Sequence, residues 1–266
     1  MKITTLIENT AVEGFLCEHG LSVYVETAKH RLIVDTGQSD AFLENAAALG
    51  IDLTQVDTLV LSHGHYDHAG GIMGFAKRNP HAKIWMQREA GGDQYHGERY
   101  IGIDKDILKL PQVRLLDGDL QLDEELSLFT GITGRRHFPK DNLNLTRIVN
   151  GQAVLDDFCH EQCLVIAENG EYTLISGCAH NGILNILDKF RALYGCDPVR
   201  VISGFHMRKK TPYDEDDLRQ IKAVAHELLA YDTQFFTGHC TGDAFPYLKE
   251  IMGERVTALC SGTRIL

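Results

Sequence analysis

Residues 61 to 71 read LSHGHYDHAGG, and this stretch decides how the rest of the chain is interpreted. The apolar run directly before the histidines, residues 56 to 63 (VDTLVLSH), predicts a short strand that is buried on both faces. The polar residues therefore follow the end of a buried strand. Three histidines and one aspartate fall within six positions there: His63, His65, Asp67 and His68.

Such a group indicates a metal site rather than a solvated turn. A single histidine in this place would be an ordinary surface residue, but neutral imidazole and carboxylate groups together suit zinc, iron or manganese. The spacing can direct these side chains into one hollow, although not all of them onto one ion. The glycines at positions 64, 70 and 71 permit the tight backbone path that this convergence requires.

Three later segments repeat the pattern of an apolar strand, a glycine and then a ligand-type side chain. They are residues 174 to 182 (LISGCAHNG), 201 to 207 (VISGFHM) and 235 to 242 (FFTGHCTG). Loops at strand ends commonly assemble sites in proteins of this type, so we expect these ends to converge on the first motif. The side chains concerned are Cys178, His180, His206, His239 and Cys240.

The remaining segments predict an α+β protein. Residues 21 to 37 predict two strands joined by a polar turn, and residues 40 to 50 predict a helix that ends near Gly50. Residues 163 to 177 give the clearest hairpin, and the last third of the chain alternates helices and strands. A β-rich part followed by an α/β part thus occurs twice. This order predicts two similar halves, packed sheet to sheet with helices outside, in one domain.

We therefore assign residues 1–266 to a single domain with one insertion. Residues 88–111 are polar and contain glycines without clear periodicity. They predict a long loop or insertion that could act as a lid over a site.

Composition narrows the class of function. The 266 residues are 44% hydrophobic and 24% charged, which is typical of a soluble globular protein, and no apolar run approaches the ~20 residues of a membrane span. Seven scattered cysteines favour reduced thiols in the cytoplasm over disulfides. The formal charge of −11 argues against nucleic acid or an anionic membrane as the partner, and leaves a small anionic substrate open.

At this point the chain resembles a known family. SHGHYDHAGG is similar to the His-x-His-x-Asp-His signature of the metallo-β-lactamase superfamily. With EHGLSVYVE, LIVDTG, SGCAHNGI, SGFHM and TGHCTG, it resembles the dihydropteroate-synthase-like branch, whose members carry the name 7,8-dihydropterin-6-methyl-4-(β-D-ribofuranosyl)aminobenzene-5′-phosphate synthase. The resemblance covers nearly the whole chain. It implies a four-layer αββα sandwich with one or two divalent metal ions at one edge of the paired sheets.

The resemblance also implies a ligand set. His63 and His65 would hold the first metal ion, and Asp67 and His68 the second, which His239 would complete. Zinc is the first choice of metal, with iron and manganese as alternatives.

The middle of the chain departs from the family pattern. Many superfamily hydrolases carry a Gly-His-Thr histidine for the first metal, whereas residues 130 to 142 read TGITGRRHFPKDN here. Either His137 or His180 fills the gap, or the first metal is held weakly. Cys178 or His180 would approach between or beside the ions, and Asp35 would orient a ligand histidine.

Three functions fit these observations. The first is a hydrolase of a phosphodiester or related ester that uses metal-activated water, with Asp67 orienting the nucleophile and His206 assisting the leaving group. The second is a transferase that joins a pterin to an aryl amine, as the branch name implies. The third is a metal- or redox-responsive binding protein, suggested by the cysteines beside the ligands. Substrate phosphate would meet one of two cationic clusters. The first is Arg135, Arg136 and Lys140, and the second is Arg208, Lys209 and Lys210.

Overall fold

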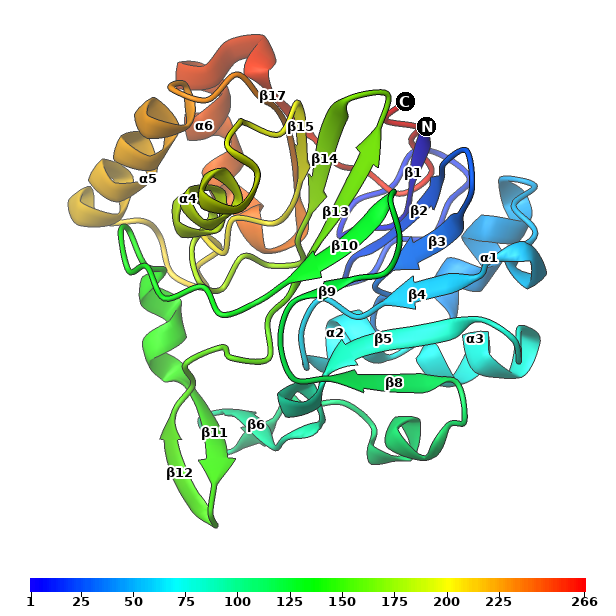
Figure 1. Ribbon diagram of the computed structural model, residues 1–266. Helices are drawn as coiled ribbons and strands as arrows, with labels where there is room; N and C mark the ends of the chain where they lie inside the picture. Colours follow the sequence, from blue (N-terminus) through cyan, green and yellow to red (C-terminus); the bar gives the residue numbers. More distant parts are fainter.

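Two β-sheets form the centre of the protein, which a computed structural model describes over residues 1–266 (Figure 1). Followed along the chain, the strands of each sheet are first antiparallel and then parallel, so the chain consists of two similar halves. The first sheet has the order β1 (Lys2–Ile7), β2 (Ser22–Glu26), β3 (Arg31–Val34), β4 (Thr58–Val60), β5 (Lys83–Gln87) and β8 (Val113–Leu116). The second has the order β17 (Val256–Ala258), β16 (Gln234–Thr237), β15 (Arg200–Ile202), β14 (Glu171–Ile175), β13 (Cys163–Glu168), β10 (Leu126–Phe129) and β9 (Leu120–Gln121).

Helices cover the outer face of each sheet. The first sheet packs against α1 (Ala41–Ala48) and α3 (Ile72–Arg78), through an apolar cluster that includes Phe42 and Phe75. On the second sheet the helices are α4 (Ile183–Tyr194), α5 (Glu215–Leu228) and α6 (Phe245–Met252).

A separate apolar cluster fills the space between the two sheets. It joins side chains of the first sheet, such as Val23 and Val34, to side chains of the second, such as Leu164 and Ile202. Each buried aliphatic side chain of this kind contributes roughly 1.5–3 kcal/mol to folding. With one cluster between the sheets and one under each helix layer, the predicted four-layer αββα sandwich is confirmed.

Local sequence explains the main boundaries. The hairpin predicted for residues 163 to 177 is present as β13 and β14, and the turn residues Asn169 and Gly170 both adopt the positive φ that such a turn requires. α5 begins after Asp214, whose side chain accepts the backbone N–H groups of Asp216 and Asp217.

Residues 88–111, predicted as a long loop or insertion, include short strands that the sequence did not indicate. This segment contains the short strands β6 (Gln94–His96) and β7 (Arg99–Tyr100), flanked by 3-10 turns at Arg88–Gly91 and Lys105–Lys109. A third sheet forms when β6 pairs with β11 (Leu145–Val149), which also pairs with β12 (Gln152–Leu155). Strands this short give no periodic pattern, and their partner lies about fifty residues later in the sequence.

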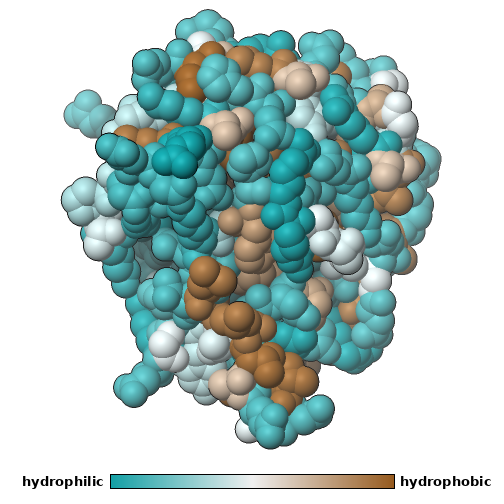
Figure 2. Space-filling model, turned by 90° about the vertical axis from the view of Figure 1, so that its left-hand side faces the viewer, coloured by the Kyte–Doolittle hydropathy of each residue, from teal (hydrophilic) through white to brown (hydrophobic).

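This small sheet projects from one side of the sandwich (Figure 1). Apolar side chains gather towards the bottom of the face that Figure 2 displays. The large exposed apolar residues of the segment between β10 and β13 are Leu143, Val154 and Leu155.

The two chain ends lie side by side at the first strand (Figure 1). Thr4 and Arg264 form an isolated antiparallel bridge, which adds the last residues to the edge of the first sheet. No helix in the structure has the length and apolar character needed to cross a bilayer.

Candidate metal centre

The ligand-type residues of both halves meet where the parallel strands end. β3 and β4 run parallel in the first sheet, and β14, β15 and β16 run parallel in the second. Four of the five segments that follow them hold a non-glycine residue at positive φ: Asp35 (60°), Ala179 (56°), His206 (47°) and His239 (49°). Such conformations are strained and concentrate at functional sites.

Three histidines form the first candidate cation position, called position 1 below. His63 and His65 come from the loop after β4 and His180 from the loop after β14, and one ring nitrogen of each lies within 4.8 Å of the others. Ser62 Oγ lies 2.9 Å from His63 Nδ1, and Asn142 Oδ1 lies 3.0 Å from His180 Nδ1. These contacts orient the rings and leave the Nε2 atoms of all three histidines buried without a protein partner.

This arrangement fits a metal ion. A buried polar atom without a hydrogen-bond partner is costly, and three such atoms this close together can be satisfied by one shared cation. Burial lowers the pKa of His63 and His180 well below the usual value, and lowers that of His65 to about 3. All three rings are therefore neutral, which is the form that binds a metal.

Position 2 lies next to position 1 and offers oxygen, nitrogen and sulfur atoms. His68 Nε2 lies 3.2 Å from His239 Nε2 and 3.2 Å from Cys178 Sγ. Asp67 Oδ2 lies 3.4 Å from His239 Nε2. The side chains come from α2 (Tyr66–Ala69) and from the loops after β14 and β16.

Side-chain oxygen atoms of two neighbouring residues fix the rings of position 2. Asp35 Oδ2 lies 2.7 Å from His68 Nδ1, and Asn9 Oδ1 lies 3.0 Å from His239 Nδ1. Such contacts to the outer nitrogen of a histidine set its tautomer and direct the other nitrogen at a ligand. The family resemblance implied that Asp35 orients a ligand histidine, without saying which one, whereas Asn9 was not anticipated.

Electrostatics keep Asp67 ionised. Burial would raise the pKa of Asp67, but hydrogen bonds from His19 and His239 hold it well below the usual range. Burial acts on His68 in the opposite sense and would lower its pKa, but the neighbouring Asp35 raises it to about 9. Position 2 thus contains charged side chains, Asp67 and His68, whereas the three imidazoles of position 1 are neutral.

Both positions open into one cavity of about 380 Å³. Apolar side chains line part of its wall: Tyr66, Ile101 and Leu145. Cationic side chains line another part: Arg99, Arg208, Lys209 and Lys210. In a chain with a formal charge of −11, this group of cations favours an anionic ligand.

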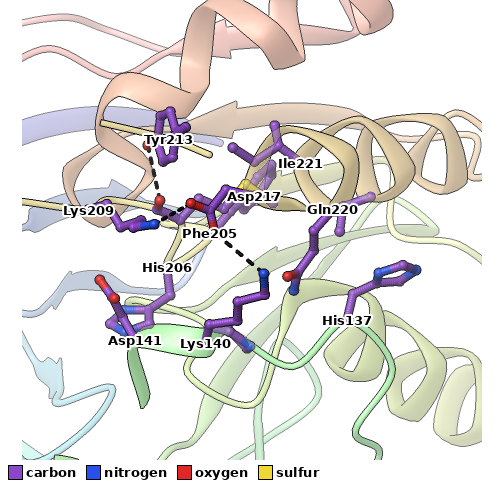
Figure 3. A pocket seen from close by; sticks show the side chains of 13 residues that line it. His137, Lys140, Asp141, Phe205, His206, Lys209, Tyr213, Asp217, Gln220 and Ile221 are labelled. Carbon is purple, nitrogen blue, oxygen red and sulfur yellow. Dashed lines mark hydrogen bonds and ion pairs between the residues drawn. The ribbon is translucent and has the colours of Figure 1, made fainter. Parts of the chain in front are cut away.

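His206 separates this cavity from a smaller one, shown in Figure 3. Its ring centroid lies 4.0 Å from that of His180, and neither of its ring nitrogens has a protein partner. Behind it, Asp217 forms ion pairs with Lys140 and Lys209, which tie the segment after β15 to α5 (Figure 3). The His206 imidazole, which has no protein partner, is thus held at the cavity wall by a segment that an ion pair anchors to α5.

Comparison with known proteins agrees with this geometry. The family model described as metallo-beta-lactamase superfamily matches residues 17–135. Over 271 residues, the chain is 30% identical to the 7,8-dihydropterin-6-methyl-4-(beta-D-ribofuranosyl)-aminobenzene-5'-phosphate synthase of Methanocaldococcus jannaschii, covering 91% of this chain and 88% of that protein. The chain belongs to the metallo-β-lactamase superfamily.

Two further relatives cover the chain to a similar extent. An uncharacterized protein of the same organism is 29% identical over 245 residues, which is 90% of each chain. The crystal structure of a metal-dependent hydrolase of the beta-lactamase superfamily superimposes with a TM-score of 0.83 at 30% identity, over 100% of this chain and 98% of that one. The predicted family and the metallo-β-lactamase fold are therefore both confirmed.

Within this metallo-β-lactamase fold, three of the predicted residues lie away from the cavity. His137 Nε2 lies 2.7 Å from Glu227 Oε1, so His180 and not His137 joins His63 and His65. Arg136 forms ion pairs with Asp188 and Glu227 on the surface. The guanidinium of Arg135 contacts Asn181 and the backbone of its own loop. Of the three arginines predicted to meet phosphate, Arg208 alone lines the cavity.

Other residues of the centre were missed from the sequence. His19 Nε2 lies 3.1 Å from Asp67 Oδ2, although His19 precedes strand β2 instead of following a strand. His160 accepts the backbone N–H of Gly64 and so supports the first loop. The buried carboxylate of Glu161 accepts the backbone N–H of His180 at 2.6 Å. Residues 18 to 20 (EHG) and 156 to 162 (DDFCHEQ) each place a histidine next to an acidic residue. This pairing was the sequence signal that could have indicated His19, His160 and Glu161.

Proposed function

We propose that this protein is a metal-dependent hydrolase of a small anionic substrate, such as a phosphodiester or a related ester. The observation that carries the proposal is the convergence of three buried, unpartnered imidazole nitrogens, from His63, His65 and His180, beside a second set of ligands. Zinc suits both sets, and iron and manganese are the alternatives. The metal-dependent hydrolase fold of the superfamily supports this assignment.

A divalent ion, when bound here, supplies Lewis-acid chemistry and activates water at neutral pH. Asp67 stays ionised at position 2, so its carboxylate can orient the attacking water by accepting a hydrogen bond from it. Asp35 holds His68 in place through a charged hydrogen bond.

His206 is the candidate proton donor to the leaving group. It lines the cavity and keeps both ring nitrogens free of protein partners. A donor at this place would neutralise the charge that develops on the departing oxygen.

Cations at the mouth of the cavity bind the anionic part of the substrate. The guanidinium of Arg208 lies 3.1 Å from His19 Nδ1, so this side chain is held towards position 2. Arg99 stands over the Tyr66 ring at 5.0 Å, and Lys210 lines the same wall. These groups favour a small phosphate or carboxylate ligand, and the negative charge of the whole protein disfavours nucleic acid.

The test uses protein purified without added metal. Elemental analysis gives the metal content, and the same sample is assayed on a panel of nitrophenyl phosphodiesters and thioesters. The proposal expects bound transition metal and turnover that a chelator abolishes. Bound metal without turnover on any ester would instead favour a non-catalytic metal-binding protein.

A second candidate function is transfer of a pterin to an aryl amine with C–N bond formation. It is favoured by the 30% identity to the aminobenzene-phosphate synthase over 91% of this chain. The metal and the cations would then organise anionic groups instead of promoting hydrolysis. Incubation with a reduced pterin diphosphate and an aryl-amine phosphate tests it, because a coupled product supports transfer and hydrolysis alone contradicts it.

A further inference from the structure

Cys240 is held more firmly than a surface or core cysteine needs to be. Three successive backbone N–H groups donate to it: His206 N to the Sγ atom at 3.3 Å, and Met207 N and Arg208 N to the carbonyl oxygen at 3.0 and 2.8 Å. A Cβ atom on Gly204 would lie 2.3 Å from the Cys240 Sγ atom, so only glycine fits there. The segment that carries His206 therefore fixes the position of this sulfur.

This sulfur faces the same ligands as position 2. Cys178, His239 and Cys240 each offer one ligand atom within 4.8 Å of the others, and both cysteines line the metal cavity. Cys178 Sγ also lies 3.2 Å from His68 Nε2. Sulfur and nitrogen ligands of one tetrahedral zinc ion lie about 3.3–3.8 Å apart, given the usual bond lengths, so small adjustments would bring both sulfurs to one ion.

The ordinary explanation for a buried cysteine does not suit this pair. Free cysteines commonly act as small apolar side chains, as Cys163 does within the cluster under the helices of the second sheet. Cys178 and Cys240 instead lie beside imidazoles, a carboxylate and the cavity cations. As a thiol, Cys240 can donate to the Cys178 carbonyl oxygen at 3.3 Å. The two sulfurs and a ring nitrogen of His239 nevertheless lie within 4.8 Å of one another, as ligands of one cation would.

We propose that Cys240 joins Cys178 at position 2, so that this position binds its cation through two thiolates in addition to imidazole. Each thiol releases one proton to solvent as the cation binds. Thiolates favour zinc and other soft or borderline cations over manganese, whereas the three histidines of position 1 do not discriminate in this way. The inference rests on the proposed metal centre and is independent of the reaction that the centre catalyses.

Cobalt(II) titration of the metal-free protein tests this inference, because thiolate ligands add a near-ultraviolet charge-transfer band that imidazole and carboxylate lack. Three single variants are compared with the original protein: Cys178→Ser, Cys240→Ser and, as the control, Cys163→Ser in β13. We expect Cys178→Ser and Cys240→Ser each to lose about half of the band, with the control unchanged. Full intensity in Cys240→Ser would overturn the inference.

A second measurement needs no variant and so does not depend on their folding. X-ray absorption at the zinc edge of the zinc-loaded original protein counts sulfur neighbours at about 2.3 Å. With two ions bound, an average of one sulfur per zinc is expected, and half of that value would mean that Cys178 binds alone. No bound metal at all would contradict the proposed centre itself, whereas cobalt without any thiolate band contradicts this inference alone.

Discussion

Position 1 and position 2 share one cavity, yet they differ in the atoms that face the cation. Position 1 is built of neutral imidazoles from two loops, His63 and His65 on one side and His180 on the other. Position 2 draws a carboxylate, imidazoles and sulfur from three separate segments, and it includes the ionised Asp67. Under the proposed function, position 1 only holds an ion, whereas position 2 also contributes the Asp67 carboxylate to the reaction.

The largest effect is expected from Asp67→Ala, which removes the reactive carboxylate of position 2. Turnover of any ester substrate should fall by about a thousandfold, which is within the range for loss of one positioned catalytic group. Asp117→Ala, at an exposed carboxylate paired with Arg88, is the control and should leave turnover unchanged. Steady-state kinetics of both variants, with their metal content measured in parallel, is the measurement. If metal-loaded Asp67→Ala kept its activity, the role assigned to Asp67 in catalysis would be wrong.

His180→Ala should break position 1 and leave position 2 intact. We expect one ion fewer per chain, with affinity at position 1 reduced at least about a hundredfold, because the loss of a ligand exceeds the loss of its supporting contact. His137→Ala is the matched control, since His137 contacts Glu227 and not the centre. Elemental analysis of both variants is the measurement. If His137→Ala lost the ion and His180→Ala kept it, position 1 would be wrongly assigned.

Asp35→Asn should weaken position 2 more than position 1, because Asp35 contacts His68 directly but reaches His63 only through the Ser62 hydroxyl. The change keeps the size of the side chain but removes the charge that orients His68 at 2.7 Å. Metal affinity at position 2 should fall by about 10–100-fold, while position 1 is affected less. Competition with a chromogenic chelator resolves the two affinities. An equal loss at both positions would mean that the contact through Ser62 matters as much as the direct contact with His68.

The smallest effect is expected from Arg208→Ala, which leaves both cation positions complete. Loss of one charge-assisted hydrogen bond should raise the KM for an anionic substrate by about tenfold, with little change in metal content. Arg136→Ala is the control, because Arg136 pairs with Asp188 and Glu227 away from the cavity. Substrate saturation curves at low and high salt measure the difference. A lower kcat with an unchanged KM would place Arg208 in catalysis instead of binding.

The sequence predicted local features well and distant pairings poorly. The hairpin at residues 163 to 177 and the helix near residues 40 to 50 depend on neighbouring residues, and both are present. The third sheet was missed, because β6 and β11 each provide only a few residues and meet through the fold.

The same distinction applies to the metal centre. The four ligand-type residues of LSHGHYDHAGG lie in one turn, so their grouping could be predicted from spacing. Spacing could not choose between His137 and His180, since that choice depends on which loop Asn142 and Glu161 hold against the first motif. His19 was overlooked because it precedes a strand, and the pattern used was that of strand ends.

The most direct test of converging strand ends is anomalous diffraction from crystals of the zinc-loaded protein, recorded on both sides of the zinc edge. Two peaks in the cavity are predicted. One should lie among His63, His65 and His180, and the other among Asp67, His68 and His239 with Cys178 as a further neighbour. The absence of any anomalous peak at these side chains in zinc-loaded crystals would contradict the account.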